Sequence, residues 1–404
     1  MSQLADLDLD GLDPFDPAFR QDPWDVYRLL REKAPVHRAP DGFWVLTRYA
    51  DASMLVREPR FSVDRSKIDP SLSEVNSENP VYQPGIPLLL FLDPPAHTRL
   101  RSLVAKAFTP RVVEGLRPRI QALVDELLDP VVERGRMDVL ADLAYPLPVA
   151  VICELLGVPR ADQDQFHGWS SAASRLLDGD LDPDTMQQGM LGAMQLLTYF
   201  TELIEERRRS PGDDLLSRLV AAEEEGERLT HEELMATTVL LFVAGHETTM
   251  NLIGNGTLAL LRHPAEYARL RDDPALVPSA VEEMLRFDGP VHLTARIPTE
   301  DVEIGGIPIP AGSRVAAVLS AANRDPAQFP DPDRFDVGRT ENRHLSFSAG
   351  PHFCLGAALA RAEGQVVFET MLRRLPELEL VTEPIRYRDH FVLRGLDELE
   401  VAFR

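Results

Sequence analysis

One unbroken helical pattern constrains the fold of this 404-residue chain more than any other feature. Between residues 230 and 262, apolar side chains recur at three- and four-residue spacing, as they do in a helix that packs against other elements. A helix of about thirty residues is roughly 45 Å long, enough to cross a whole domain. We therefore expect it to run through the protein core.

The centre of this predicted helix carries polar groups that are unusual for a buried position. Residues 244–249 have the sequence AGHETT. A threonine hydroxyl can bond a carbonyl one turn back, and the small pair leaves room beside the backbone, so we expect a local widening that holds a ligand and water. Alternatively, Thr248 and Thr249 satisfy themselves against the helix and Glu247 forms a salt bridge elsewhere. We expect His246 to be packed or linked to solvent rather than catalytic, because no second metal-ligand residue follows four positions later on its face.

Cys354, one of two cysteines, lies in residues 347–356, FSAGPHFCLG, just before a helix predicted over 355–374. A thiol at a helix start has a lowered pKa, which favours the thiolate, a metal ligand. Gly350 and Gly356 flank it where a chain turns tightly and lets a planar group approach. This arrangement suits a cysteine ligand of haem iron, whose electron donation favours cleavage of the O–O bond.

The alternative for Cys354 is a buried structural thiol, an interpretation that fits Cys153 in the apolar run 149–156. The complete pattern F-x-x-G-x-x-x-C-x-G nevertheless resembles the haem-binding loop of the cytochrome P450 superfamily. One position departs from the commonest form of that loop, since Ser348 stands where a glycine is frequent. The contacts with haem b that the resemblance implies involve Phe347, Gly350, His352, Cys354 and Gly356 in the loop, Ala244 and Gly245 in the long helix, and His97, Arg101 and Arg296 elsewhere.

Two further segments carry the same resemblance. Residues 244–249 are similar to the oxygen-binding helix of the superfamily, where an acid followed by threonine relays protons to dioxygen; Glu247 and Thr248 take these roles by the match. Residues 93–101 look like the helix that meets the haem propionates, with His97 and Arg101 four apart on one face. The alternative for each propionate donor is an ordinary solvated surface residue.

A Glu-Arg-Arg network is also implied by the resemblance. Glu283 and Arg286 are three apart on one helical face, which alone describes an ordinary surface pair. Arg334, within 329–335, is expected to complete the network and to hold the cysteine loop against the core through bidentate hydrogen bonds.

The remaining patterns predict a helix-rich α+β fold. A hairpin is expected to turn at Asp41-Gly42 before a strand over 43–47, and short strands are expected within 295–319 and near 378–381 and 398–403. Helices are predicted over 23–32, 94–108, 112–133, 147–156, 162–177, 183–209, 213–224, 264–271 and 277–287. The resemblance covers the chain from about residue 20 onward and implies one cytochrome P450 domain over 1–404, with 1–18 as a flexible N-terminal segment.

Composition narrows the class of protein. Few cysteines and no secretory signal favour the cytoplasm, and no apolar run reaches the roughly 18 to 20 residues of a membrane span. A net charge of -23 opposes nucleic-acid binding. A local basic face remains possible, with candidates at Arg99, Arg101, Lys106, Arg111, Arg361 and Arg373. We expect Lys106 and Arg111 to help dock an electron donor; a solvated face is the alternative.

The implied function is a monooxygenase that hydroxylates or epoxidises a hydrophobic small molecule with O2. Because neither a flavin domain nor an iron-sulfur cysteine set is present, electrons are expected from a ferredoxin with its reductase, or from a flavodoxin. A macrolide, terpenoid, steroid or fatty acid would suit an apolar pocket. Among these, the resemblance favours a polyketide or related product of secondary metabolism. The alternatives are a peroxide-driven peroxygenase and a haem-binding sensor or carrier without turnover. The expected pocket residues are Leu89, Leu90, Val243, Val291, Leu293, Thr294, Phe391 and Val392.

Overall fold

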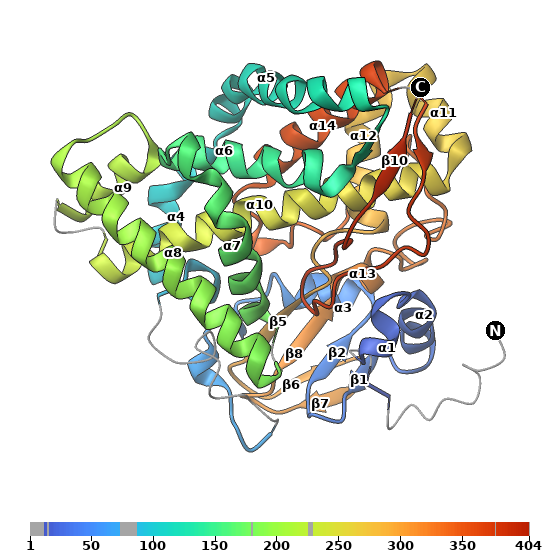
Figure 1. The fold of residues 1–404 in the computed structure, drawn as a ribbon. Coiled ribbons are helices and arrows are strands. Elements are labelled where there is room, and N and C mark those ends of the chain that lie inside the picture. The colour runs from blue at the N-terminus through green and yellow to red at the C-terminus, as the bar shows by residue number, and fades with distance from the viewer. Residues whose placement is uncertain are drawn as a thin grey trace. The chain divides into compact units, whose positions relative to one another are not determined.

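Helix α10, His231–Arg262, confirms the predicted long helix in the computed structural model (Figure 1). Its start follows from a capping box. The Thr230 hydroxyl accepts from the Glu233 N–H at 3.2 Å, and the Glu233 carboxylate accepts from the Thr230 N–H at 2.9 Å. Phe242, Leu252 and Ile253 are buried, as expected of a core helix.

The structure describes residues 12–13, 16–72, 87–178, 181–224, 229–375 and 377–403. Most of the N-terminal segment predicted to be flexible lies outside these ranges. Within them, Asp16 caps the short helix α1, Pro17–Arg20, by accepting from the Ala18 N–H at 2.8 Å.

The chain divides into two compact units, and the division falls within α10. Residues of α10 up to Ile253 belong to the second unit, and those from Gly254 onward belong to the first. The first unit comprises Met1–Val75, Gly254–Cys354 and Glu379–Leu399. The second unit comprises Asn76–Ile253, Leu355–Leu378 and Glu400–Arg404.

A five-stranded sheet of order β1-β2-β8-β5-β3 organises the first unit (Figure 1). β2 runs parallel to β8, whereas the other neighbours are antiparallel. All four side chains of β8 are buried, which is why this central strand is a continuous apolar run. The strands of this unit are β1 (Val36–Arg38), β2 (Trp44–Leu46), β3 (Phe61–Ser62), β5 (Leu293–Pro298), β6 (Val302–Ile304), β7 (Ile307–Ile309), β8 (Val315–Val318) and β9 (Glu379–Leu380).

The predicted hairpin is confirmed between β1 and β2. Val36 lies opposite Leu46, and the turn has Gly42 at φ 87°, a left-handed conformation that glycine adopts without steric cost. The Asp41 carboxylate accepts from the Phe43 N–H at 3.0 Å and fixes the turn. The other helices of the first unit are α2 (Trp24–Lys33), α3 (Tyr49–Leu55), α11 (Pro264–Asp272), α12 (Val277–Phe287) and α13 (Leu319–Ala322).

The second unit is mainly helical. Polar contacts join two of its longest helices, α5 and α14: Arg117 donates to Gln365, and Gln121 donates to Thr370 at 3.0 Å. The rings of Phe166, Phe200 and Phe242 pack together in its core. Its elements besides the first part of α10 are α4 (Ala96–Val104), α5 (Pro110–Arg134), β4 (Arg136–Asp138), α6 (Pro146–Leu156), α7 (Phe166–Ser174), α8 (Pro183–Arg209), α9 (Leu215–Glu224), α14 (Ala357–Arg374) and β10 (Glu400–Ala402).

The observed elements confirm the helix-rich α+β class. α8 and α12 have the bounds that the sequence predicted. The helix predicted over 162–177 is shorter, because tight 3-10 turns at Arg160–Gln165 and Arg175–Leu177 replace its two ends. Within the described ranges, no helix combines the length and apolarity needed to cross a membrane.

Candidate active site

The cysteine loop is held by its own backbone. The Cys354 N–H donates to the Phe347 carbonyl at 2.9 Å, and the Phe353 N–H donates to the Gly350 carbonyl at 3.1 Å. The first bond closes the loop from Phe347 to Cys354, and the second closes a turn within that loop. The Cys354 side chain is exposed. α14 begins at Ala357, so the predicted helix start after the cysteine is confirmed.

Gly350 is required by the shape of this loop. Its φ of 68° is left-handed, and a Cβ at this position would lie 2.5 Å from the Val56 carbonyl oxygen. Any side chain here would therefore strain the backbone and collide with a neighbouring segment. Ser348 also has a left-handed φ, 57°, so the departure from the common loop pattern falls where a glycine would be unstrained.

Gly356 serves a different purpose from Gly350. Its φ is -83°, which any residue adopts, and a Cβ there would meet no atom within 4 Å. Backbone strain therefore does not explain the glycine. The open space beside it suits the close approach of a planar group, as the sequence predicted.

α10 has an open face in the middle of a largely buried helix. Ala244 is exposed, and Leu240 and Thr248, one turn to either side, are half-buried. The Thr248 hydroxyl donates to the Ala244 carbonyl at 3.0 Å, which confirms the expected bond one turn back. The helix remains α-helical throughout, so the room comes from small side chains rather than from the widened turn that we expected.

The residues beside this open face are tightly packed. Gly245 lets α6 approach closely, because a Cβ there would lie 3.0 Å from the Ile152 side chain. Glu247 is buried, and its carboxylate Oε1 lies 3.8 Å from Nε2 of His246, which is also buried. His246 is packed between the rings of Phe242 and Tyr145, as expected.

The predicted propionate donors lie on elements that hold them firmly. His97 and Arg101 share one face of α4, and burial together with the charge of Arg101 lowers the pKa of His97. A neutral imidazole can still donate one hydrogen bond. In the first unit, Arg296 is buried on β5 and donates to the Thr294 hydroxyl at 2.8 Å, while His352 is half-buried in the turn before the cysteine.

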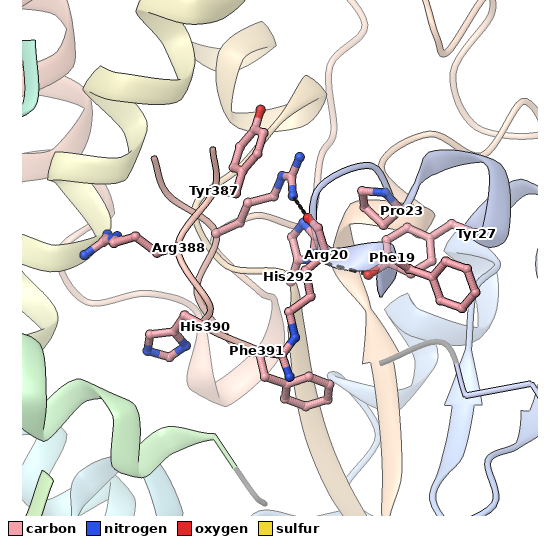
Figure 2. A pocket seen from close by; sticks show the side chains of 10 residues that line it. Phe19, Arg20, Pro23, Tyr27, His292, Tyr387, Arg388, His390 and Phe391 are labelled. Atoms are coloured by element: carbon pink, nitrogen blue, oxygen red, sulfur yellow. Dashed lines mark hydrogen bonds between the residues drawn. The ribbon is translucent and has the colours of Figure 1, made fainter. Parts of the chain in front are cut away.

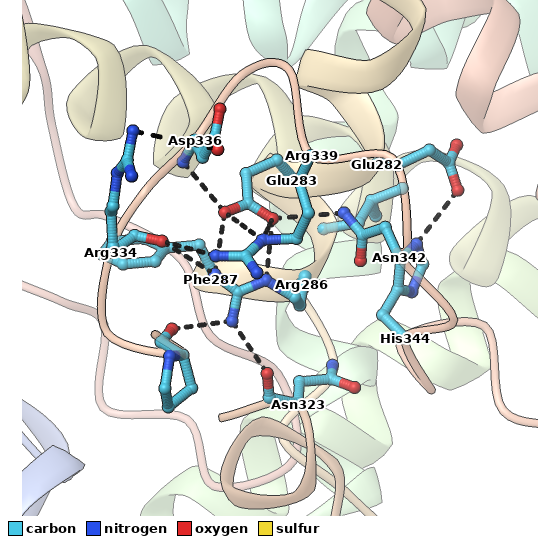
Figure 3. A network of polar contacts seen from close by, with 12 residues as sticks. Glu282, Glu283, Arg286, Phe287, Asn323, Arg334, Asp336, Arg339, Asn342 and His344 are labelled. Atoms are coloured by element: carbon cyan, nitrogen blue, oxygen red, sulfur yellow. Dashed lines mark hydrogen bonds and ion pairs between the residues drawn. The ribbon is translucent and has the colours of Figure 1, made fainter. Parts of the chain in front are cut away.

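The Glu-Arg-Arg network is present, but the sequence prediction of Arg334 as its third member is wrong. Arg286 donates to both carboxylate oxygens of Glu283 at 2.7 and 2.8 Å, and both side chains are fully buried (Figure 3). The third guanidinium belongs to Arg339, which donates to Glu283 at 3.1 and 3.2 Å. The Arg334 side chain is 61% exposed, and only its carbonyl takes part, accepting from both arginines.

Some predicted pocket residues are brought together, and others belong to the core. Val291 and Val392 lie in adjacent segments, because Val291 bridges to Leu393 and the His292 N–H donates to the Val392 carbonyl at 2.9 Å. The Phe391 side chain lines a small hollow with Phe19, Tyr27 and His292 (Figure 2). Leu89 and Leu293 are buried, whereas Leu90 is exposed and Val243 and Thr294 are half-buried.

The arrangement of each unit fits a thiolate-bound haem. The first unit offers an exposed thiol on a backbone-braced loop, the donor type that binds haem iron. The second unit offers open space beside Gly356 and beside Ala244. These features are those expected of a protein that binds haem through a cysteine thiolate.

Comparison with known proteins establishes the family. A family model described as Cytochrome P450 matches residues 76–393, and the chain belongs to the cytochrome P450 family. Cytochrome P450 107B1 of Saccharopolyspora erythraea is 44% identical over 399 residues, covering 96% of both chains. The monooxygenase PikC of Streptomyces venezuelae is 43% identical over 96% of this chain and 92% of its own. The solved myxobacterial CYP267B1, in complex with myristic acid, has a TM-score of 0.88 and 44% identity, covering 96% of this chain and 98% of its own.

The chain is thus a cytochrome P450 monooxygenase, a class that binds haem and uses O2 and redox partners. Bound haem supplies the activation of dioxygen, and a cysteine thiolate ligand favours cleavage of the O–O bond. In enzymes of this kind the cofactor carries the chemistry, and the protein supplies binding, orientation and electrostatics.

Proposed function

We propose that this monooxygenase hydroxylates or epoxidises a hydrophobic small molecule of the polyketide type in secondary metabolism. The open apolar face of α10 carries the proposal: Ala244 is exposed and Val243 is half-buried within a core helix, so a large apolar ligand can lie against it. The names of two relatives support the substrate class, 6-deoxyerythronolide B hydroxylase of Saccharopolyspora erythraea, at 40% identity over 99% of both chains, and the polyketide biosynthesis P450 PksS of Bacillus subtilis, at 38% identity over 96% of this chain.

Optical titration tests this substrate class. We expect macrolactones to shift the haem absorption of the purified enzyme from low spin to high spin at lower concentrations than fatty acids or steroids. A Val243→Phe variant, which adds bulk at a predicted pocket position beside the open face, should weaken macrolactone binding about tenfold or more. Glu232→Ala, at an exposed position in the first turn of the same helix, is the matched control and should bind normally. Tighter binding of fatty acids than of every macrolactone would contradict the proposed class.

The acid-alcohol pair on α10 supplies the proposed proton path. Glu247 would hold a proton on its carboxylate, and Thr248 would orient water next to the open face of the helix. The half-buried position of Thr248 supports this role, because its hydroxyl donates to the carbonyl of the exposed Ala244. Glu247→Gln should therefore divert NADH electrons from product to hydrogen peroxide, with unchanged substrate binding. Normal coupling in this variant would exclude the proposed path.

Cys354 is the proposed iron ligand, with Phe347, Gly350 and Gly356 shaping the haem-binding loop. His97, Arg101, Arg296 and His352 are the proposed propionate donors. All of these residues lie within one catalytic domain, which we propose to span the chain and to reside in the cytoplasm.

A separate ferredoxin with its reductase, or a flavodoxin, is the proposed electron donor. Lys106 and Arg111 are exposed on neighbouring segments at the start of α5, which suits them to an acidic partner. Reversing both charges should slow reduction by the donor protein and leave reduction by dithionite unchanged. Equal rates of donor-driven reduction in the variant and the parent enzyme would count against this surface.

A peroxide-driven peroxygenase is the second candidate within the family. The buried acid beside Thr248 favours the O2 route, because two-electron reduction of dioxygen takes up two protons that must be delivered to the site, whereas hydrogen peroxide already carries them. Comparing product yield with NADH, a ferredoxin and its reductase against yield with hydrogen peroxide alone separates the two. Product from peroxide alone, with none from the electron-transfer system, would favour the peroxygenase.

A further inference from the structure

His246 holds a fixed relation to the buried acid of α10. Its Nδ1 lies 2.8 Å from the Phe242 carbonyl oxygen, one turn back along the helix. A carbonyl oxygen can only accept, so Nδ1 must carry a proton. The other ring nitrogen, Nε2, is therefore the one whose protonation can change.

That second nitrogen faces a carboxylate. Nε2 lies 3.8 Å from Oε1 of Glu247, and both side chains are almost fully buried. A buried carboxylate that carries charge is costly unless a cation or donor compensates it, and a protonated Nε2 would do so. The distance exceeds a hydrogen bond by about 1 Å, so a small rotation of the carboxylate brings the two atoms together.

The ring of Tyr145 contacts both His246 and the exposed His167. This ring lies edge-on to His246, with centroids 6.0 Å apart, and edge-on to His167 at 4.2 Å. Burial and then the charge of Glu247 raise the pKa of Tyr145, which keeps its hydroxyl protonated. That hydroxyl is buried and finds no hydrogen-bond partner among the described residues. A protonated hydroxyl can accept one proton while it donates another.

We propose that His246 shares a proton with Glu247 and resupplies it from the side of Tyr145 and His167. A proton that arrives at Nε2 gives an imidazolium beside the carboxylate. Transfer of the proton from Nε2 to Oε1 then leaves a neutral imidazole and a neutral carboxylic acid. That acid can donate its proton towards Thr248 and the open face of α10. No electron moves in this step. The inference rests on the proposed role of Glu247 and assigns His246 as its proton donor.

Nitrogen NMR of the histidine rings tests the pair without turnover. In the carbon monoxide complex of the reduced, 15N-histidine-labelled enzyme, the His246 signals are those missing from His246→Phe. We expect a proton on Nδ1 and an Nε2 signal that moves in Glu247→Gln while the Nδ1 signal stays. An Nε2-protonated neutral ring, or an Nε2 signal unaffected by Glu247→Gln, would overturn the proposal.

Coupling measurements test the same pair in the reaction. His246→Phe keeps the ring contacts with Phe242 and Tyr145 but removes both nitrogens, and it should lower the rate of product formation about tenfold and increase the loss of electrons to hydrogen peroxide. His263→Phe is the matched control, since Nδ1 of His263 makes the same bond to the Ala259 carbonyl at 2.7 Å on α10 while its ring packs against Phe287 and Phe335. This control should couple normally.

The two proposals fail in different ways. If Glu247→Gln uncouples the reaction and His246→Phe does not, the role of His246 is wrong and the relay through Glu247 stands. If Glu247→Gln itself couples normally, the relay is wrong and no donor to Glu247 is needed. Tyr145→Phe should reproduce part of the effect of His246→Phe, because it removes only the hydroxyl.

Discussion

The guanidinium of Arg339 donates to both carboxylate oxygens of Glu283, at 3.2 and 3.1 Å. Glu283 also receives the N–H of Asp336 at 3.0 Å and the amide of Asn342 at 3.1 Å. One buried acid thus ties α12 to the segment that leads towards the cysteine loop.

Replacing Arg339 tests this assignment. Arg339→Ala removes charge-assisted hydrogen bonds from a buried carboxylate and should lower the free energy of unfolding by about 2–3 kcal/mol. Arg334→Ala, at an exposed position, should change it by no more than about 0.5 kcal/mol. Urea denaturation of the two variants is the measurement, and a larger loss for Arg334→Ala would reverse the assignment.

Ser348 gives a prediction of increased stability. A non-glycine residue at φ 57° is strained, and its buried Oγ has no hydrogen-bond partner among the described residues. Ser348→Gly relieves the strain and should stabilise the folded state by up to about 1 kcal/mol, net of the entropy that glycine adds to the unfolded chain. Ser348→Val should be destabilising, since a branched Cβ is least tolerant of this conformation. Thermal unfolding that ranks valine above glycine would disprove the strain.

Glu363 on α14 should make stability depend on pH. Burial raises its pKa to about 8, and Oε2 lacks a hydrogen-bond partner in the part of the chain that the structure describes. Because the folded state holds this proton more tightly than the unfolded state, its contribution is full below about pH 4.5 and is lost progressively as the pH rises towards 8. The loss by pH 7 is about 3 kcal/mol.

Glu363→Gln should remove that pH dependence, because an amide does not ionise. We expect urea midpoints of the variant to exceed those of the parent at pH 7.5 and to match them more closely at pH 5. Glu369→Gln, at an exposed position on the same helix, is the control and should follow the parent at both values. Parallel curves for parent and Glu363→Gln would show that the carboxyl ionises normally.

The two cysteines should behave oppositely towards haem. Cys354 is exposed on its loop, whereas Cys153 is fully buried on α6 and burial raises the pKa of its thiol to about 12. The reduced carbon monoxide complex should lose its red-shifted Soret band in Cys354→Ala and keep it in Cys153→Ala. A band that survives in Cys354→Ala would exclude this residue as the ligand.

Much of the fold could be predicted because local signals agreed with one another. The capping box at Thr230 and Glu233 marks the start of α10, and Asp41-Gly42 marks the β1–β2 hairpin. The prediction from sequence is Arg334, within 329–335, and does not consider Arg339; spacing alone does not show which arginine side chain turns inward. Gly338, directly before Arg339, is the sequence signal nearest to the arginine that does.

The open face of α10 shows a second limit of sequence reasoning. The pattern AGHETT predicted room beside the helix, but not whether backbone or side chains create it. The distance between His246 and Glu247 depends on the rotamers of their two side chains, which the hydrophobic periodicity of a helix does not predict. The approach of His246 to Glu247, although the two are neighbours in sequence, is therefore known only from the structure.

The close approach of Gly350 to the Val56 carbonyl has a consequence for the order of assembly. The two segments are far apart in the sequence, and such non-local contacts form late because the intervening chain must first be gathered. A chain that has not placed the segment after α3 has nothing to set the cysteine turn against. The shape of the ligand loop is thus set in part by a residue far earlier in the sequence, so a change at Val56 would reach the loop that carries Cys354.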